Sequence, residues 1–204
     1  MATRWEEFYR LVQPHVPGCP EVVMDNHIRD AAVDFCERSE VWTYQALAEQ
    51  TVDGVSDYPV AIPGSSVLEN VISVHVDGLL LARVSELHSS NNPTAPKGMP
   101  RRYSVFEDQE LRFFPTPDRA YTLYATVVLK PTLAASGVED FIFRTHGRTI
   151  ACGAIASLMI TPGKEWTNLE LAAYYKTKFS RGADDAKGRD TRRSNLRAKS
   201  VRFA

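Results

Sequence analysis

The order of hydrophobic periodicities along the 204-residue chain predicts an α+β protein, in which a helical bundle carries an inserted antiparallel β domain. Three observations support this fold class. Apolar residues recur at three- and four-residue spacing near both ends, they alternate in the middle, and the last residues are basic with few apolar side chains. We expect a bundle from residues 1–44 and 132–188, a β domain from 45–131, and an extended basic C-terminal arm from 189–204.

The N-terminal part of the bundle is expected to contain two helices. Residues 5–12 form a short amphipathic segment that Pro14 should terminate, because proline lacks a backbone N–H. Pro20 suits the first position of a second helix, whose apolar face continues to Cys36 and predicts an end near Ser39. The outward positions of this second helix are Arg29, Asp30, Asp34, Glu37 and Arg38.

Alternating apolar residues predict six or seven short strands in the middle of the chain. The expected strands are 49–52, 58–62, 71–76, 79–84, 102–106, 110–114 and 121–129, with turns at 53–54, 77–78 and 108–109. Asp77-Gly78 is the strongest hairpin signal, because both residue types tolerate a positive φ. Residues 88–100 are rich in Ser, Asn and Pro and are expected to form a loop.

Two further helices are expected near the C-terminus. The first begins at Glu139 and ends before Pro162-Gly163, and its small residues would let another helix approach closely. These small residues are Ala151, Gly153, Ala154 and Ala156. The second helix follows Asn168 and reaches Phe179, and its apolar pattern ends after Gly182.

Charge is distributed unevenly along the chain. The whole sequence has a formal net charge of −1, from 24 basic and 25 acidic residues. Residues 181–204 hold eight Lys or Arg and three Asp, so this segment carries +5 and residues 1–180 carry −6. An acidic body with a basic end is typical of a protein that contacts a charged partner.

The cysteines and the hydropathy pattern point to a cytoplasmic place of synthesis. Three cysteines without CxxC spacing are too few for a disulfide framework, so we expect free thiols in a reducing compartment. No apolar run approaches the ~20 residues that cross a bilayer, and the N-terminus lacks a signal-peptide pattern. We therefore expect no membrane partner.

The sequence argues against an enzyme. The five histidines are scattered, and neither HExxH, GxSxG, Walker A nor GxGxxG occurs. His75 and Asp77 lie two residues apart, which is more typical of a solvated strand end than of a metal site. The paired acids Glu139-Asp140 open a helix, where they complement its dipole. We expect no catalytic residue, no metal site and no cofactor.

The basic C-terminal segment has two possible partners. Its Lys and Arg side chains suit sequence-independent contacts with nucleic-acid phosphates, and they equally suit an acidic groove on another protein. Phe203, next to the last residue, argues against an inert tail, because an aromatic ring at a solvated end has no local function.

Several short motifs, in this order, give the chain a recognisable resemblance. They are Val16-Pro17-Gly18-Cys19-Pro20, Asp34-Phe35-Cys36-Glu37-Arg38, Trp42, Gly153-Ala154, Pro162-Gly163-Lys164-x-Trp166-x-Asn168, Ala172-x-Tyr174 and Lys178-Phe179. Together they resemble the head-to-tail adaptor (head-completion) proteins of tailed bacteriophages, of the type that short-tailed phages place beneath the portal. The resemblance covers both ends of the chain and is weakest from 45 to 130.

The resemblance implies a structural virion protein at the head–tail interface. Such adaptors form twelve-membered rings beneath the portal and extend a C-terminal arm along it. The portal-binding residues would then be Arg192, Arg193, Leu196, Arg197, Lys199, Arg202 and Phe203. The β domain would meet the next tail component, a nozzle or tail tube. DNA would pass through the ring without specific binding, because an acidic wall does not hold it.

An alternative is a cytoplasmic nucleic-acid-binding protein that uses the same basic segment. The overall charge argues against it, because a dedicated DNA-binding protein rarely carries an excess of acids over its folded body.

Overall fold

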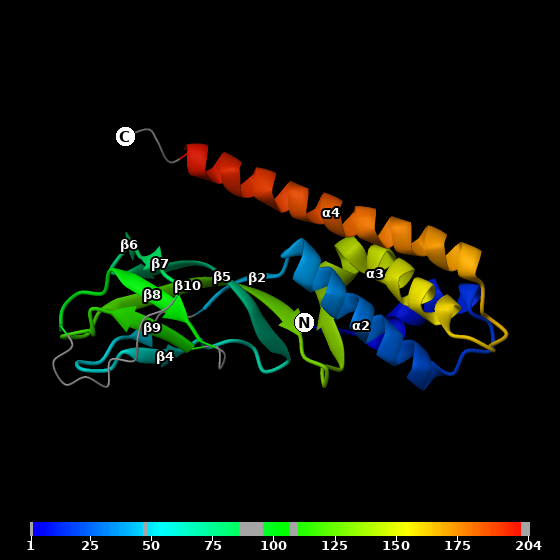
Figure 1. The fold of residues 1–204 in the computed structure, drawn as a ribbon, viewed down its shortest axis with the longest axis horizontal. Helices are drawn as coiled ribbons and strands as arrows, with labels where there is room; N and C mark the ends of the chain where they lie inside the picture. Colours follow the sequence, from blue (N-terminus) through cyan, green and yellow to red (C-terminus); the bar gives the residue numbers. More distant parts are fainter. Residues whose placement is uncertain (1, 47–48, 86–95, 107–109, 201–204) are drawn as a thin grey trace. The chain divides into compact units, whose positions relative to one another are not determined.

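The computed structural model describes residues 2–46, 49–85, 96–106 and 110–200, with the backbone alone for 190–200. It contains helices and several sheets, so the predicted α+β class is confirmed. The chain divides into two compact units. The helical unit comprises residues 1–42, 65–67 and 130–204, and the β unit comprises 43–64 and 68–129. Figure 1 labels helices of the helical unit and strands of the β unit and colours them by their position in the sequence.

The N-terminus of the helical unit starts with a strand that the sequence analysis missed. Strand β1 (Ala2–Arg4) pairs antiparallel with β11 (Gly137–Glu139), and a Cβ on Gly137 would lie only 2.1 Å from the carbonyl oxygen of Thr3. The helical segment that follows comprises η1 (Trp5–Phe8), α1 (Tyr9–Val12) and η2 (Gln13–His15). The α-helix ends at Val12, before Pro14 as expected, and Pro14 lies near the start of the following 3₁₀ turn, which needs no backbone N–H from it.

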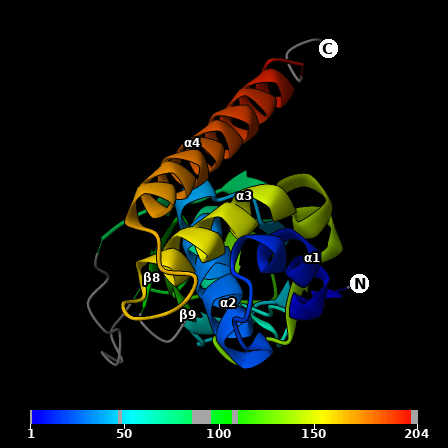
Figure 2. The same cartoon turned by 90° about the vertical axis from the view of Figure 1, so that its right-hand side faces the viewer.

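Three long helices form the core of the helical unit: α2 (Glu21–Ser39), α3 (Asp140–Ile160) and α4 (Leu169–Ser200). The predicted boundaries of α2 and the predicted start of α3 are confirmed to within one residue. The C-terminus of α2 is closed by Glu40 in the left-handed region, whose N–H donates to the carbonyl of Cys36. The largest fully buried side chains here are Phe8, Met24, Ile28, Phe35, Ile142, Ile150, Ile155 and Leu158. Figure 2 shows α3 lying between α2 and α4.

Helix α4 differs from the sequence expectation. We expected an extended arm from residue 189, whereas the backbone of 189–200 continues α4 as helix, and 201–204 lie outside the described residues. Ala, Leu, Lys and Arg dominate this segment, and all are good helix formers. Each residue added to an existing helix gains a hydrogen bond without a new nucleation cost, so little apolar burial is needed. Basic side chains also complement the C-terminal end of the helix dipole.

Two sheets make up the β unit. One has the strand order β2-β10-β5-β6, with β3 also on β10, and the other has the order β4-β9-β8-β7. Their bounds are β2 Thr43–Gln45, β3 Glu49–Gln50, β4 Asp57–Pro59, β5 Ser66–Val76, β6 Leu79–Leu80, β7 Ala82–Arg83, β8 Arg102–Val105, β9 Glu110–Phe114 and β10 Thr122–Pro131. The described pairings are antiparallel except that β7 runs parallel to β8. Phe113, Leu111, Val74 and Val76 are among its fully buried side chains.

The turn predicted at Asp53-Gly54 is confirmed, but the strands around it do not form a hairpin. The segments around Asp53-Gly54 do not pair with each other, because β3 joins β10 and β4 joins β9 in the other sheet. Gly54 does turn, with a φ of +81°, and its N–H donates to the carbonyl of Pro117. The local turn therefore forms as its residues predict, and the strands on either side of it belong to different sheets.

The hairpin predicted at Asp77-Gly78 is confirmed. Both residues have a positive φ, and Val76 pairs with Leu79 across the turn. The β8–β9 hairpin is confirmed as well, although its predicted turn at 108–109 lies outside the described residues. Most of the predicted 88–100 loop also lies outside them.

Candidate functional site

The C-terminal half of α4 carries most of the residues that the sequence analysis singled out. Arg192, Arg193, Leu196, Arg197 and Lys199 belong to its last turns, where the structure describes the helical backbone and not the side chains. Arg202 and Phe203 lie outside the described residues. The structure therefore gives five of these positions a helical setting.

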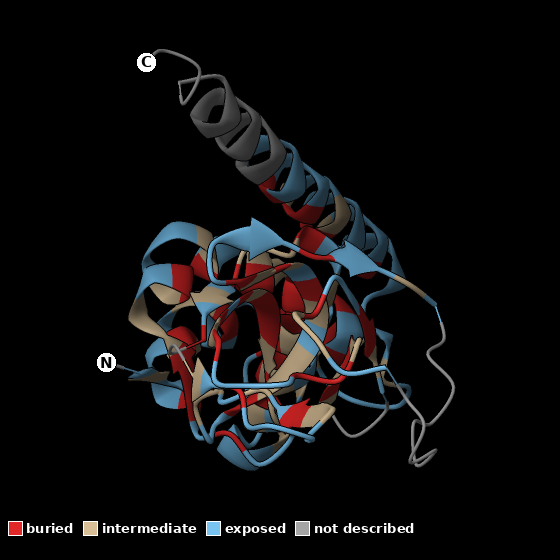
Figure 3. Cartoon of the chain, turned by 90° about the vertical axis from the view of Figure 1, so that its left-hand side faces the viewer, coloured by how far each residue is buried: buried red, intermediate tan, exposed pale blue. Residues whose placement is uncertain are grey.

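Helix α4 is attached to α3 by a narrow buried stripe. Its buried side chains recur at helical spacing and are Ala172, Phe179, Ala183 and Ala186. Figure 3 shows buried stretches that interrupt the mostly exposed surface of α4 where its burial is described. A Cβ on Gly153 of α3 would lie 2.8 Å from the ring of Phe179, and a Cβ on Gly182 of α4 would lie 2.5 Å from Thr149. The two helices thus approach closely because each has a glycine where the other has a side chain.

Polar contacts join α4 to α2 along its other side. The Nζ of Lys187 lies 3.1 Å from Glu40 Oε1, and Arg38 reaches Asp184 at 3.7 Å. Arg38 also donates to the Ser180 hydroxyl at 3.4 Å and lies over the Phe179 ring. All of these groups are partly exposed, so each ion pair contributes little to stability alone. Together they hold α4 against α2 as far as residue 187.

The register of the α3–α4 hairpin makes α4 extend past α3. Gly153 lies against Phe179, and Thr149 lies against Gly182. Burial lowers the pKa of His146, and the charge of Arg189 lowers it further, so Arg189 lies near His146. Continuing this antiparallel register brings Asp140, the first residue of α3, level with about residue 192 of α4. The last turns of α4 therefore reach about 12 Å beyond the start of α3, at a rise of about 1.5 Å per residue.

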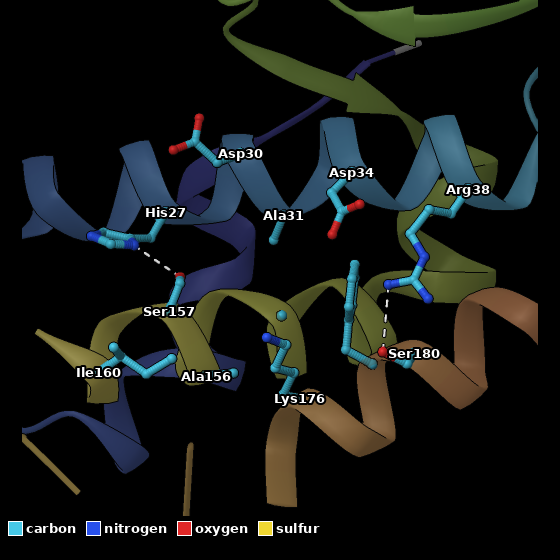
Figure 4. Close-up of a pocket in the computed structure, with 12 residues that line it drawn as sticks. His27, Asp30, Ala31, Asp34, Arg38, Ala156, Ser157, Ile160, Lys176 and Ser180 are labelled. Atoms are coloured by element: carbon cyan, nitrogen blue, oxygen red, sulfur yellow. Dashed lines mark hydrogen bonds between the residues drawn. The ribbon is translucent and has the colours of Figure 1, made fainter. Parts of the chain in front are cut away.

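A groove of about 420 Å³ lies between α2 and α4, with α3 as its floor. Figure 4 shows His27, Asp30, Asp34 and Arg38 on α2, Ser157 and Ile160 on α3, and Lys176 and Ser180 on α4. Its floor is mostly small or apolar, because Ala31, Gly153 and Ala156 also line it. Burial raises the pKa of Asp34 and lowers that of His27. The sequence analysis placed Asp30 and Asp34 facing outward, which is confirmed, but it did not detect the groove beside them.

His27 and Ser157 of the groove do not form a nucleophile–base pair. Nδ1 of His27 lies 2.8 Å from the Ser157 hydroxyl, which itself donates to the carbonyl of Ala154. The hydroxyl proton is thus in use, so His27 is the donor in this pair and does not activate Ser157 as a nucleophile. The sequence feature that comes nearest to indicating the groove is the pair of acids Asp30 and Asp34, four residues apart on the exposed side of α2.

The thiols are also unsuited to nucleophilic chemistry. Burial raises the pKa of Cys36 to about 12, and it raises the pKa of Cys19 and Cys152 as well. Within the described ranges, no group of three or more His, Cys, Asp or Glu residues could hold a metal ion. A search of the same part of the chain found no helix with the length and hydropathy of a membrane span.

Comparison with known proteins identifies the family. No curated protein matches the chain. The family description "SU10 adaptor protein" matches residues 10–202, which is nearly the whole chain. An adaptor family favours a structural role over catalysis and indicates a virion component that contacts other head or tail proteins. The chain belongs to the SU10 adaptor protein family, and its resemblance to phage head-to-tail adaptors is confirmed.

Proposed function

We propose that this protein forms a ring beneath the portal of a tailed phage and connects the portal to the tail. The observation that carries the proposal is the family match over residues 10–202, which includes both the helical unit and the basic end of α4. A ring of twelve subunits, assembled at the head–tail interface after synthesis in the host cytoplasm, is part of the proposal.

The proposed portal contact is the C-terminal segment, residues 189–204. It contains Arg192, Arg193, Leu196, Arg197, Lys199, Arg202 and Phe203. Its helical backbone to Ser200 supports the proposal, because a helix that extends past α3 carries these basic positions beyond the bundle. Arginine forks favour carboxylates, so an acidic surface on the portal is the expected partner. Apolar Leu196 and Phe203 would anchor the contact, and the arginines would steer it.

The β unit is proposed to meet the next tail component, a nozzle or tail tube. Its acidic side chains outnumber its basic ones by ten to six, counted over residues 43–64 and 68–129. A net negative surface also suits a channel that DNA crosses without specific binding, because like charges repel.

The test is attachment of the purified chain to DNA-filled heads that lack an adaptor. A variant without residues 191–204 should keep the helical circular dichroism of the rest of the bundle and melt within a few degrees of the intact chain. The physical reason is that the described contacts between α4 and its neighbours α3 and α2 lie at or before Arg189. The same variant should fail to attach to heads, which electron microscopy or co-sedimentation would measure.

A charge-reversal triple, Arg192→Glu, Arg193→Glu and Arg197→Glu, separates charge from length. It should also fail to attach, while the matched triple to lysine should retain part of the attachment because it keeps the charge. Normal attachment of the truncated variant would overturn the proposed contact. Salt-sensitive binding to free DNA, with no attachment to heads, would instead favour the nucleic-acid-binding alternative.

A further inference from the structure

The wall of the groove on α2 carries two carboxylates, and the charges of Arg38 and Lys176 act on one of them, Asp34. Asp30 and Asp34 are both exposed, and neither forms a salt bridge or hydrogen bond with any residue that the structure describes. Arg38 follows them one turn later, so the exposed stripe 30, 34, 38 has the charge order −, −, +. Beside it, the floor of the groove leaves Ile160 half exposed.

A second stripe lies on a different side of α4. Its residues are Tyr174, Lys178, Arg181 and Asp185, all exposed and spaced by three or four positions. Lys176 lines the groove, and Lys178 is two residues further along α4, which places it roughly 200° around the helix from Lys176. The ammonium of Lys178 sits 4.6 Å from the ring centre of Tyr174, which is 51% exposed. Among the described residues neither Lys178 nor Arg181 has a carboxylate partner.

The two stripes have opposite charge orders at matching intervals. Lys178, Arg181 and Asp185 read +, +, − over seven residues, and Asp30, Asp34 and Arg38 read −, −, + over eight. At about 1.5 Å per residue these intervals are about 10 Å and 12 Å, which long side chains can bridge. The match holds only when the two helices run in the same direction. Helix α3 is antiparallel to both α2 and α4, so α2 and α4 run in the same direction within one chain.

We propose that the α4 stripe of one copy docks into the α2–α4 groove of a second copy, with Lys178 on Asp30, Arg181 on Asp34 and Asp185 on Arg38. This inference rests on the proposed ring and names the two surfaces that would build it. The contact is heterologous, because two different surfaces meet, and repetition of such a contact closes a ring when the rotation allows it. Rotation about an axis along the helices keeps α4 of one copy parallel to α2 of the next.

The apolar part of the contact is supplied by Tyr174. It lies one turn before Lys178 and would reach the end of the groove next to His27 and Ile160. An aromatic ring on the apolar floor excludes water from the neighbouring ion pairs, which strengthens them. Charges alone would give register and specificity, and the ring would add affinity.

Charge reversal in the full-length chain tests the proposal. The groove variant is Asp30→Lys with Asp34→Lys, and the stripe variant is Lys178→Glu with Arg181→Glu. Each should lose the multimer that the wild-type chain forms, because like charges then face each other. Size-exclusion chromatography with light scattering measures the mass, and circular dichroism checks that each variant is folded. Glu6→Lys with Glu7→Lys is the matched control for the groove variant, since both residues are exposed on η1 and the two variants change the net charge equally.

Restoring complementarity should restore assembly. An equimolar mixture of the groove and stripe variants is expected to assemble, because each variant's stripe then faces a groove of opposite charge. The chain with all four substitutions should assemble for the same reason. Multimers in either single-surface variant would overturn the inference, as would failure of both rescues in folded protein. A wild-type chain that does not self-associate, either free or on heads, would overturn it too.

The outcome is separable from that of the proposed portal contact. A wild-type chain that multimerises through these surfaces but does not attach to heads would support this inference and contradict the proposed function. If both charge-reversed variants attach to heads and form unaltered multimers, the result would support the proposed function and contradict this inference.

Discussion

Gly153 is the residue on which the approach of three helices depends. A Cβ at this position would lie 2.8 Å from the Phe179 ring and 3.1 Å from Cβ of Ala31. Phe179 on α4 and Ala31 on α2 are both buried, so neither can move away freely. A single hydrogen in place of a methyl group thus lets α2, α3 and α4 meet at one point and forms the floor of the groove.

We expect Gly153→Ala to destabilise the protein by up to about 2 kcal/mol. Alanine gains about 1 kcal/mol of helix propensity, but overpacking typically costs about 1–3 kcal/mol and here no neighbour can yield cheaply. Urea unfolding followed by circular dichroism measures the difference. Gly188→Ala is the control, because its Cβ would meet nothing within 4 Å and it should stabilise α4. Equal stabilisation by both substitutions would show that the helices adjust to the methyl group.

At the scale of elements, the β5–β6 turn is held by backbone conformation and by one carboxylate. Asp77 and Gly78 have φ values of 47° and 80°. The Asp77 side chain accepts a hydrogen bond from the Thr122 N–H at 2.8 Å, and its own N–H donates to the carbonyl of Thr122 at 2.9 Å. The turn therefore also fixes the position of β10.

Gly78→Ala should lower the free energy of unfolding by about 1 kcal/mol, although its Cβ would have open space around it. The cost arises because an L residue is strained at this positive φ. Differential scanning calorimetry of the full chain would detect the lower melting temperature. Gly64→Ala is the comparison, since Gly64 has no positive φ and an added Cβ there would have no neighbour within 4 Å. No difference between the two variants would contradict the assignment of strain.

The elements predicted correctly are those with strong local signals. Asp77-Gly78 specifies its own turn, and α2 has a proline before it and an unbroken apolar face. The β1–β11 pair was missed, because three-residue strands have too little pattern and their partner lies more than 130 residues away. The pairing of β3 with β10 likewise depends on distant residues, whereas the turn at Gly54 is local. The helical end of α4 does not follow from its apolar pattern, because helix propensity and the preceding turns continue the helix without further burial.

The candidate site was less predictable than the fold. The basic C-terminal residues can be identified from the sequence because the charge of a residue follows from its type and does not depend on its contacts. The groove needs α2, α3 and α4 together, and no local signal indicates which faces of three separate helices leave a gap. Asp30 and Asp34 look like ordinary surface acids until the helices beside them are known.

At the scale of the whole molecule, each compact unit has buried side chains of its own. Replacing residues 43–129, which include only the short 65–67 segment of the helical unit, with a Gly/Ser linker should leave a soluble protein with helical circular dichroism. The two ends to be joined are held near each other, since Lys130 contacts Glu37 at 2.6 Å shortly before the exit at Trp42. The measurement is the far-ultraviolet spectrum and its thermal transition. Loss of the helical signal would mean that the helices depend on the β unit.

The continuous α4 also acts as a lever. About 13 residues, or about 20 Å, separate Lys187, which contacts Glu40, from the last described turn at Ser200. A tilt of α4 by about 5° would displace the far end by about 2 Å at this length. The packing of α4 between its close contact at Gly182 and the ion pair at Lys187 thus sets the positional accuracy of the basic end, and a methyl group added at either glycine contact would misalign that end.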